Sequence, residues 1–198
     1  MKPGWAVTVA EGRIGVRPIR LRDGRAWRRL RARNRSWLHE WDATLPPGGE
    51  ETASSYGRMV RQLRSSARAG RALPYVSTYD GAMVGQVGVH NIVWGSACFG
   101  QVSYWIDEAH AGREIVPTAV ALLGDHCFRR LGLHRLEIAV RPENTASVRV
   151  AEKLGFTLIG MAPRYLHING AWRDHHLYAV TVEDVPEGLL ARWSQRRR

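Results

Sequence analysis

The stretch Gln101–Phe156 reads QVSYWIDEAHAGREIVPTAVALLGDHCFRRLGLHRLEIAVRPENTASVRVAEKLGF, and the order of its parts decides the fold. A strand is expected to end near Ile106, a loop rich in backbone donors follows, and Pro117 begins a helix, because proline is favoured in the first turn. The free N–H groups at a helix start attract anions, as does the helix dipole. We therefore expect this helix start to bind the diphosphate of a nucleotide-bearing acyl carrier.

A second strand and a second helix follow. The strand covers residues 135–140, and the sequence PENTAS precedes a helix over residues 145–154. This helix ends at Gly155, a residue that a left-handed helix cap prefers. Asn144 and Ser147 are three residues apart at the helix start and therefore share one face. Asn144 is equally suited to capping the helix, so its position alone allows a structural role or a role in ligand binding.

Several short motifs in this stretch resemble the central motifs of the GNAT superfamily of N-acetyltransferases, and within it the RimJ and RimL type of ribosomal-protein N-terminal acetyltransferase. They are Tyr104-Trp105-Ile106, Gly112-Arg113, Gly132-Leu133-His134-Arg135, Glu143-Asn144 with Ala146-Ser147, and Ala151-Glu152-Lys153-Leu154-Gly155-Phe156. The likeness continues through Ile168-Asn169-Gly170, Trp172-Arg173-Asp174 and Tyr178. It covers roughly residues 14–182 and is weak before Tyr75. The resemblance implies an α/β GNAT fold and an acyltransferase that uses acetyl-CoA as co-substrate.

The phosphate loop departs from the family pattern at three positions. The family has Gln or Arg, then Gly three residues later, then Gly or Ala two residues beyond, whereas this chain has Ala111, Glu114 and Val116. Glu114 adds bulk and a negative charge where phosphate is expected. If its side chain turns outward, the backbone donors stay available, and we expect acetyl-CoA binding to be retained.

The resemblance also implies which residues form the site. In the family, the strand before the phosphate loop parts from its neighbour, so backbone groups near Trp105 and Ile106 can pair with pantetheine and hold the developing oxyanion. Asn144 would pair with the pantetheine amides, and Ser147 would protonate the leaving thiolate. The expected cofactor-binding residues are Trp105, Ile106, Gly112, Arg113, Glu114, Ile115, Val116, Pro117, Thr118, Asn144 and Ser147.

The acceptor amine must lose a proton before it attacks. An α-amino group titrates near 7.7 to 8.0 and a lysine side chain near 10.4, a difference of about 2.5 units or roughly 3.4 kcal/mol. A protein N-terminus therefore needs only a modest base. Glu40 and Asp42, at the end of the first predicted helix, are the candidates, although both suit surface carboxylates equally well. The residues expected to line the acceptor cleft, or else to stabilise the sheet, are Tyr165, Asp174 and His175.

Composition favours one cytoplasmic domain over residues 1–198, with a core at about 14–182. The first residues lack an apolar run of signal-peptide length, and the apolar stretch at 116–123 is too short to span a bilayer, so we expect no membrane association. Cys98 and Cys127 are too few and too far apart for a disulfide framework or a paired metal motif. We expect both to be core residues and predict no metal.

The net charge of +11 is concentrated in arginines at 25–35 and in a basic tail at 192–198. Such clusters can attract RNA or a ribosome, but charge runs are usually only a solvated helix face and a frayed tail, and we favour that explanation. Three hypotheses follow: an acetyltransferase for the N-terminal α-amine of a ribosomal or other protein, one for a small amine or antibiotic, and a non-catalytic basic module that binds RNA or the ribosome. We favour the first. No motif separates a monomer from a homodimer.

The expected element order is β-α-α-β-β-β-α-β-α-β-β, a mixed sheet of about seven strands with about four helices. Helical spacing of apolar residues predicts a helix that Asp23 caps and that continues to Trp41. The other expected helices cover 51–69, 117–131 and 145–154. The expected strands cover 15–19, 73–79, 83–91, 98–106, 135–140, 157–168 and 172–182, with turns at Asp80-Gly81, Trp94-Gly95 and Asn169-Gly170.

Overall fold

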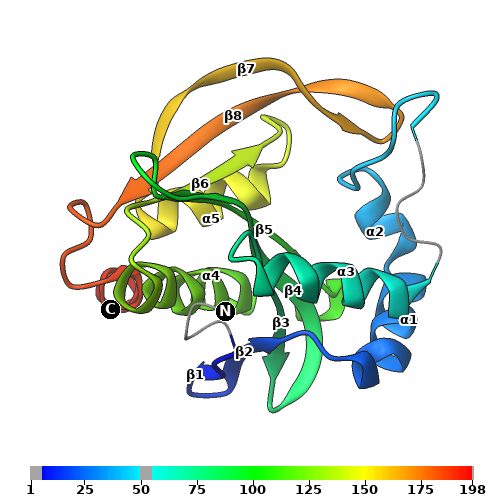
Figure 1. The fold of residues 1–198 in the computed structure, drawn as a ribbon, viewed down its shortest axis with the longest axis horizontal. Helices are drawn as coiled ribbons and strands as arrows, with labels where there is room; N and C mark the ends of the chain where they lie inside the picture. The colour runs from blue at the N-terminus through cyan, green and yellow to red at the C-terminus, as the bar shows by residue number, and fades with distance from the viewer. Residues whose placement is uncertain (1–5, 50–54, 198) are drawn as a thin grey trace.

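A single mixed sheet organises the chain, for which a computed structural model describes residues 6–49 and 55–197 (Figure 1). Within these residues it has eight strands in the order β1-β2-β3-β4-β5-β6-β8-β7, and all neighbours are antiparallel except β5 and β6. The strands are β1 (Val9–Glu11), β2 (Ile14–Pro18), β3 (Leu73–Tyr79), β4 (Ala82–Val93), β5 (Phe99–Ile106), β6 (Arg135–Val140), β7 (Thr157–Ile168) and β8 (Ala171–Thr181). The α/β GNAT fold class is thus confirmed, with one strand, β1, beyond the seven expected.

Six α-helices accompany this sheet in the described residues. They are α1 (Gly24–Arg33), α2 (Arg35–His39), α3 (Tyr56–Arg68), α4 (Ile115–His126), α5 (Thr145–Leu154) and α6 (Leu189–Arg196). Short 3-10 turns cover Leu21–Asp23 and Glu108–His110, and a π-helical turn, Cys127–Leu131, continues α4.

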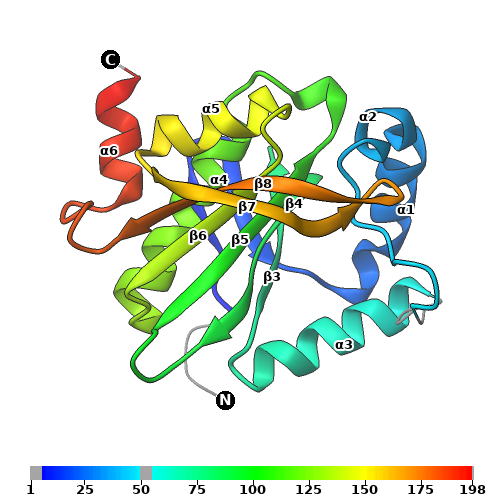
Figure 2. The same ribbon diagram turned by 90° about the horizontal axis from the view of Figure 1, so that it is seen from above.

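The helices cover both faces of the sheet (Figure 2). On one face α4 is buried almost throughout and packs with α5 and α6 over the main core, which includes Tyr75, Val87 and Leu136. On the other face α3 and α1 cover a smaller cluster around Val60 and Val76. The hairpin of β7 and β8 arches above the sheet, and its tip contacts the segment after α2 through the Ala43–Ile168 bridge.

The predicted hairpin turns at Asp80-Gly81 and Asn169-Gly170 are confirmed. Asp80 and Gly81 join β3 to β4, and Asn169 and Gly170 join β7 to β8, and all four residues have positive φ. Two consecutive left-handed residues match the twist of the flanking strands, and Asn-Gly and Asp-Gly adopt this conformation at low cost.

The first predicted helix was wrong in its continuity and in its cap. It breaks at Asn34, whose side-chain amide donates to the Asp107 carboxylate at 2.7 Å and whose side-chain oxygen accepts from the Glu108 N–H at 2.9 Å. The Asp23 carboxylate makes no capping bond to α1 but accepts from Arg17 and from the backbone N–H of Arg20. A buried carboxylate and a buried amide thus satisfy each other across the chain rather than along a helix.

Three other boundaries also differ from the prediction. Helix α4 begins at Ile115, so Pro117 is its third residue, a position that tolerates proline because the first-turn N–H groups lack helical partners. Helix α3 begins at Tyr56 behind the cap Ser55, whereas the predicted residues 51–54 lie outside the described residues. The tail predicted to fray instead forms α6, in which Leu189 and Trp193 are buried.

Candidate active site

Strands β5 and β6 separate after a short parallel ladder. Their pairing covers only Phe99 with Arg135, Gly100 with Leu136 and Gln101 with Glu137. Beyond that point β5 continues to Ile106 along β4, and β6 continues along β8. The edge of β5 over residues 102–106 therefore faces a gap rather than a ladder, and an exposed strand edge can pair with the amides of an extended ligand.

The loop after β5 is anchored by the buried carboxylate of Asp107. It accepts hydrogen bonds from Arg33 Nε at 2.9 Å, from Asn34 Nδ2 at 2.7 Å and from the His110 ring at 2.6 Å. Burial opposes ionisation, yet the bonds from Asn34, His110 and Arg33 hold the pKa of Asp107 below its usual value. This network fixes the start of the predicted phosphate loop against the first two helices.

The loop then enters α4 through two left-handed residues, Gly112 with φ of 74° and Glu114 with φ of 58°. The first helical bond runs from the Thr118 N–H to the Glu114 carbonyl at 3.2 Å. The N–H groups of residues 115 and 116 precede that bond and belong to the helix start, where anions are favoured. Because a left-handed conformation costs a non-glycine residue about 1 kcal/mol, Glu114 occupies a position that suits glycine better.

The Glu114 side chain lies between two cations. Its carboxylate is 3.4 Å from Lys153 Nζ, at the end of α5, and 2.9 Å from Arg197 Nε, just after α6. The charge of Glu114 is thus compensated, which relieves part of its repulsion toward a phosphate.

The other predicted loop residues fall into two groups. Gly112 and Arg113 are exposed in the loop, whereas the side chains of Ile115, Pro117 and Thr118 are buried and Val116 is half-buried. The buried residues can therefore offer a ligand only backbone groups.

The start of α5 lies opposite the free edge of β5. Asn144 Oδ1 accepts from the Ser147 N–H at 3.0 Å, and the Ser147 carbonyl accepts from the Tyr104 hydroxyl at 3.4 Å. Burial raises the pKa of Tyr104 to about 12, so this hydroxyl stays protonated and can donate. The capping role of Asn144 is confirmed, while its contact with pantetheine stays a prediction.

A cavity of about 190 Å³ lies on the sheet face opposite α4. Cross-strand neighbours of β4 and β5 form its floor. The lining residues of the two strands are Gln86, Val87, Gly88, Val89, His90, Ser103, Tyr104 and Trp105. Gln86 Oε1 accepts from the indole N–H groups of Trp27 at 3.1 Å and Trp105 at 3.3 Å, which closes one end of the floor.

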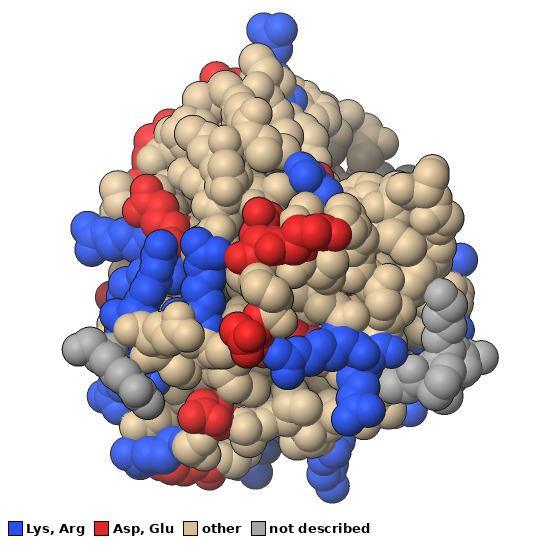
Figure 3. Space-filling view, turned by 90° about the vertical axis from the view of Figure 1, so that its left-hand side faces the viewer, with Lys and Arg blue, Asp and Glu red and all other residues tan. Residues whose placement is uncertain are grey.

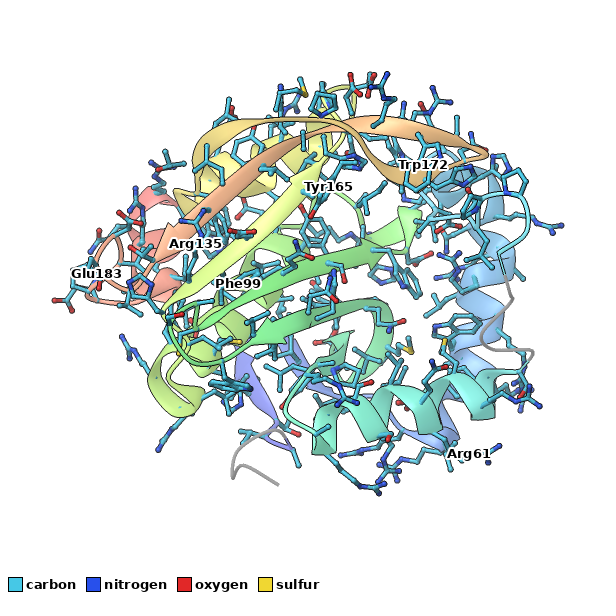
Figure 4. All side chains as sticks on the ribbon, turned by 45° about the horizontal axis from the view of Figure 1, so that its top comes forward. Arg61, Phe99, Arg135, Tyr165, Trp172 and Glu183 are labelled. Atoms are coloured by element: carbon cyan, nitrogen blue, oxygen red, sulfur yellow. The ribbon has the colours of Figure 1, made fainter. Side chains whose placement is uncertain are left out.

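His90 is the titratable imidazole of this cavity, and sequence reasoning missed it. Burial lowers the pKa of His90 below its usual value, so the ring is neutral near pH 7. Opposite His90 in the ladder, Gln101 donates to the hydroxyl of Tyr165 at 3.0 Å, as β7 reaches over β5 (Figure 4). In the sequence, Gln86, Gly88 and His90 alternate with the buried residues Val87 and Val89. This alternation is the signal from which His90 could have been found.

The predicted bases do not line this cavity. Glu40 is exposed at the end of α2, and Asp42 pairs with Arg31 at 2.5 Å. Asp174 accepts from the Arg164 N–H at 2.7 Å, so it stabilises the β7–β8 hairpin.

The remaining predicted cleft residue, His175, is buried and stacks edge-on against Tyr165 at 5.8 Å between ring centroids. Burial lowers the pKa of His175, which keeps the ring neutral under the arch.

Within residues 6–49 and 55–197, no cluster of three or more His, Cys, Asp or Glu side chains is arranged to hold a metal ion. None of the helices in these residues combines the length and the apolar character needed to cross a bilayer. Cys127 is fully buried in the main core, as expected, and burial raises the pKa of its thiol, whereas Cys98 is only half-buried.

Comparisons with known proteins agree with this geometry. The sequence profile of the acetyltransferase (GNAT) domain matches residues 13–157. The chain is 30% identical over 191 residues to the ribosomal protein uS5-alanine N-acetyltransferase of Escherichia coli (strain K12), covering 92% of this chain and 94% of that protein. It is 30% identical over 175 residues to the probable N-acetyltransferase YjcK of Bacillus subtilis (strain 168), covering 86% and 95%. The solved structure of Mycobacterium smegmatis RimJ in complex with CoA-disulfide has 38% identity and a TM-score of 0.93, covering 100% of this chain and 98% of that one.

Proposed function

Because the chain belongs to the GNAT acetyltransferase family, we propose that it transfers acetyl from acetyl-CoA to the N-terminal α-amine of a protein, a ribosomal protein being the preferred acceptor. The observation that carries the proposal is the gap between β5 and β6, which leads to the starts of both α4 and α5. The similarity to the Escherichia coli uS5-alanine N-acetyltransferase and to Mycobacterium smegmatis RimJ supports the choice of acceptor.

The hydrogen-bonding groups around the gap between β5 and β6 fit acetyl-CoA. A free strand edge suits the amides of pantetheine, and the start of α4 suits a diphosphate. The bound co-substrate supplies a thioester whose carbonyl oxygen gains negative charge during attack. N–H groups on the edge of β5 near Trp105 and Ile106 stabilise that charge, and their fixed geometry needs no reorganisation. The Ser147 hydroxyl, at the start of α5, then donates a proton to the leaving thiolate.

The acceptor amine approaches from the cavity on the opposite face of β5. Its nitrogen forms a bond to the acetyl carbon as the carbon–sulfur bond breaks, and its excess proton passes to a base. Neutral His90 in the cavity floor is suited to accept that proton, directly or through one water. Glu40 and Asp42 stay predicted candidates for this base. Asp42 is the less favourable of the two, because its carboxylate is already paired with Arg31.

Two arginines of the basic run at 25–35 have acidic partners within the fold. Arg31 pairs with Asp42, and Arg33 pairs with the buried Asp107, so part of the run has a structural role. On the molecular face that carries α6, acidic and basic side chains are interspersed rather than segregated (Figure 3). This face of mixed sign lacks the continuous positive potential that RNA backbone binding needs.

Acetylation of defined acceptors tests the proposal. The purified chain is incubated with acetyl-CoA and three acceptors: a peptide with a free N-terminus, the same peptide with a blocked N-terminus and an internal lysine, and a panel of small amines including aminoglycosides. We expect mass spectrometry to find acetyl only on the free α-amine. Acetylation of small amines alone would instead support the second hypothesis, and no acetylation of any acceptor would remove both enzymatic proposals.

A further inference from the structure

A second recess, of about 620 Å³, lies beside the start of α4. It is lined by Glu114, Lys153, Trp193, Arg196 and Arg197, which come from the loop, from α5 and from the C-terminal segment. Helix α6 and Arg197 follow residue 157, where the match to the family profile ends. The recess therefore depends on a segment that the family pattern does not describe.

Trp193 fixes the position of two cations in this recess. The indole is only 2% exposed, and its N–H donates to Thr118 Oγ1, in the first turns of α4, at 3.0 Å. Lys153 Nζ lies 5.5 Å and the Arg197 guanidinium carbon 5.8 Å from the indole ring centroid. Cation–π contact with a buried ring holds both side chains close to α4.

Arg196 ties the end of α6 to the end of α5. Its guanidinium donates to the carbonyl of Glu152 at 2.5 Å and to that of Lys153 at 3.3 Å. Three cations, Lys153, Arg196 and Arg197, thus share the recess with the single carboxylate of Glu114. This leaves a formal surplus of positive charge beside a helix start that already favours anions.

The Glu114 carboxylate lies where an anionic group of a ligand would contact the cations of the recess. Its carboxylate contacts both Lys153 and Arg197, and it sits at the N-cap of α4, next to the N–H groups proposed to bind the diphosphate. A ligand group that extends beyond that diphosphate and carries more charge than a carboxylate can displace Glu114 from the two cations. A phosphomonoester has this property, since it carries close to two negative charges at pH 7 and prefers Lys and Arg partners.

We infer that this recess binds the 3′-phosphate of the adenosine end of CoA, and that Glu114 holds Lys153 and Arg197 in place until the phosphate replaces it. The inference rests on the proposed use of acetyl-CoA. It assigns α6 a role in selecting 3′-phosphorylated CoA over dephospho-CoA, which lacks only that phosphate. It also makes Glu114 a displaceable competitor at a position where the family has glycine.

Calorimetric titration of the full chain with CoA and with dephospho-CoA tests the inference. We expect the wild type to bind CoA at least about tenfold more tightly, since charge-assisted phosphate contacts contribute at least this factor. Arg197→Ala and Lys153→Ala should each reduce the preference for CoA over dephospho-CoA severalfold, because each removes a cation that contacts the 3′-phosphate. Arg61→Ala, an exposed arginine on α3 at the other face of the sheet, is the matched control and should keep the full preference.

Glu114→Gln provides an independent variant, because it keeps the shape of the side chain and removes the competing charge. We expect it to raise the affinity for CoA severalfold and to leave the secondary structure, measured by circular dichroism, unchanged. Equal wild-type affinity for the two ligands, or an equal preference in Arg197→Ala and Arg61→Ala, would overturn the inference while leaving the acetyltransferase proposal standing. Failure of both ligands to bind would overturn the proposed function and the inference together.

Discussion

The side-chain oxygen of Asn144 accepts a hydrogen bond from the backbone N–H of Ser147 at 3.0 Å, at the start of α5. The same turn is held to β5 by the Tyr104 hydroxyl, which donates to the Ser147 carbonyl. The cap therefore fixes the position of Ser147 relative to the free edge of β5. The turn at Asn144 and Ser147 therefore contributes both to the stability of α5 and to the proposed catalysis. Substitutions at these two residues can separate the two contributions.

Asn144→Ala should lower the free energy of unfolding by about 1 kcal/mol, because it removes the N-cap of α5. Asn144→Ser keeps a capping oxygen and should recover most of that loss. If Asn144 also pairs with pantetheine amides, Asn144→Ser will bind acetyl-CoA more weakly despite its near-normal stability. Urea denaturation and calorimetry measure the two effects, and unaltered acetyl-CoA affinity in both variants would limit Asn144 to capping.

Ser147→Ala should reduce kcat about 10²-fold, the lower end of what a general acid contributes, and should change acetyl-CoA affinity little. The backbone bonds of Ser147 to Asn144 and Tyr104 do not require its hydroxyl, so the fold is retained. Thr145→Ala, at an exposed residue of the same turn, is the control. Steady-state kinetics with a free N-terminal peptide make the comparison, and equal rates for the two variants would discard the assigned role.

His90→Gln should reduce kcat/KM and remove one limb of the pH profile. Since burial lowers the pKa of His90 below 6.5, the ring is neutral at pH 7, and the rate falls only when the pH drops far enough to protonate it. In His90→Gln, this decrease in rate at acidic pH, the acid limb of the profile, should disappear. His134→Gln, at an exposed residue that pairs with Glu183, should retain it. An identical acid limb in wild type and His90→Gln would transfer the role of base to another group.

Asp107→Asn should destabilise the protein by about 3 kcal/mol, because it removes the charge that Arg33 and Asn34 partner at a buried position. The folded-state pKa of Asp107 is depressed, so its contribution is present above the ordinary aspartate pKa of about 3.9 and is lost as pH falls through the folded value. The difference in unfolding free energy between wild type and Asp107→Asn should therefore be largest near pH 7 and should shrink as the pH is lowered below about 3.9. A difference that stays constant with pH would contradict this account.

Local sequence signals predicted the central part of the fold. Strand β6 and helix α5 have the predicted bounds, because alternation, an N-cap at Asn144 and a left-handed Gly155 all act within a few residues. The start of α4 was misplaced because the proline preference pointed to Pro117, whereas the left-handed residue that precedes the helix is Glu114.

Long-range contacts account for the errors. The break between α1 and α2 follows from the bond of Asn34 to Asp107, which are 73 residues apart, and no local pattern reports it. Helix α6 was readable in principle, since Leu189 and Trp193 have helical spacing, but the arginines beside them suggested a solvated tail. The cavity around His90 required the register of β4 and β5, and for that reason the sequence pointed to Glu40 and Asp42 instead.

Calorimetric titration of the unmodified chain with acetyl-CoA tests the central claim most directly, namely that the gap between β5 and β6 holds the acyl donor. The account predicts saturable heat with one ligand bound per chain. A flat titration at ligand concentrations far above the range of ordinary enzyme substrates would contradict it.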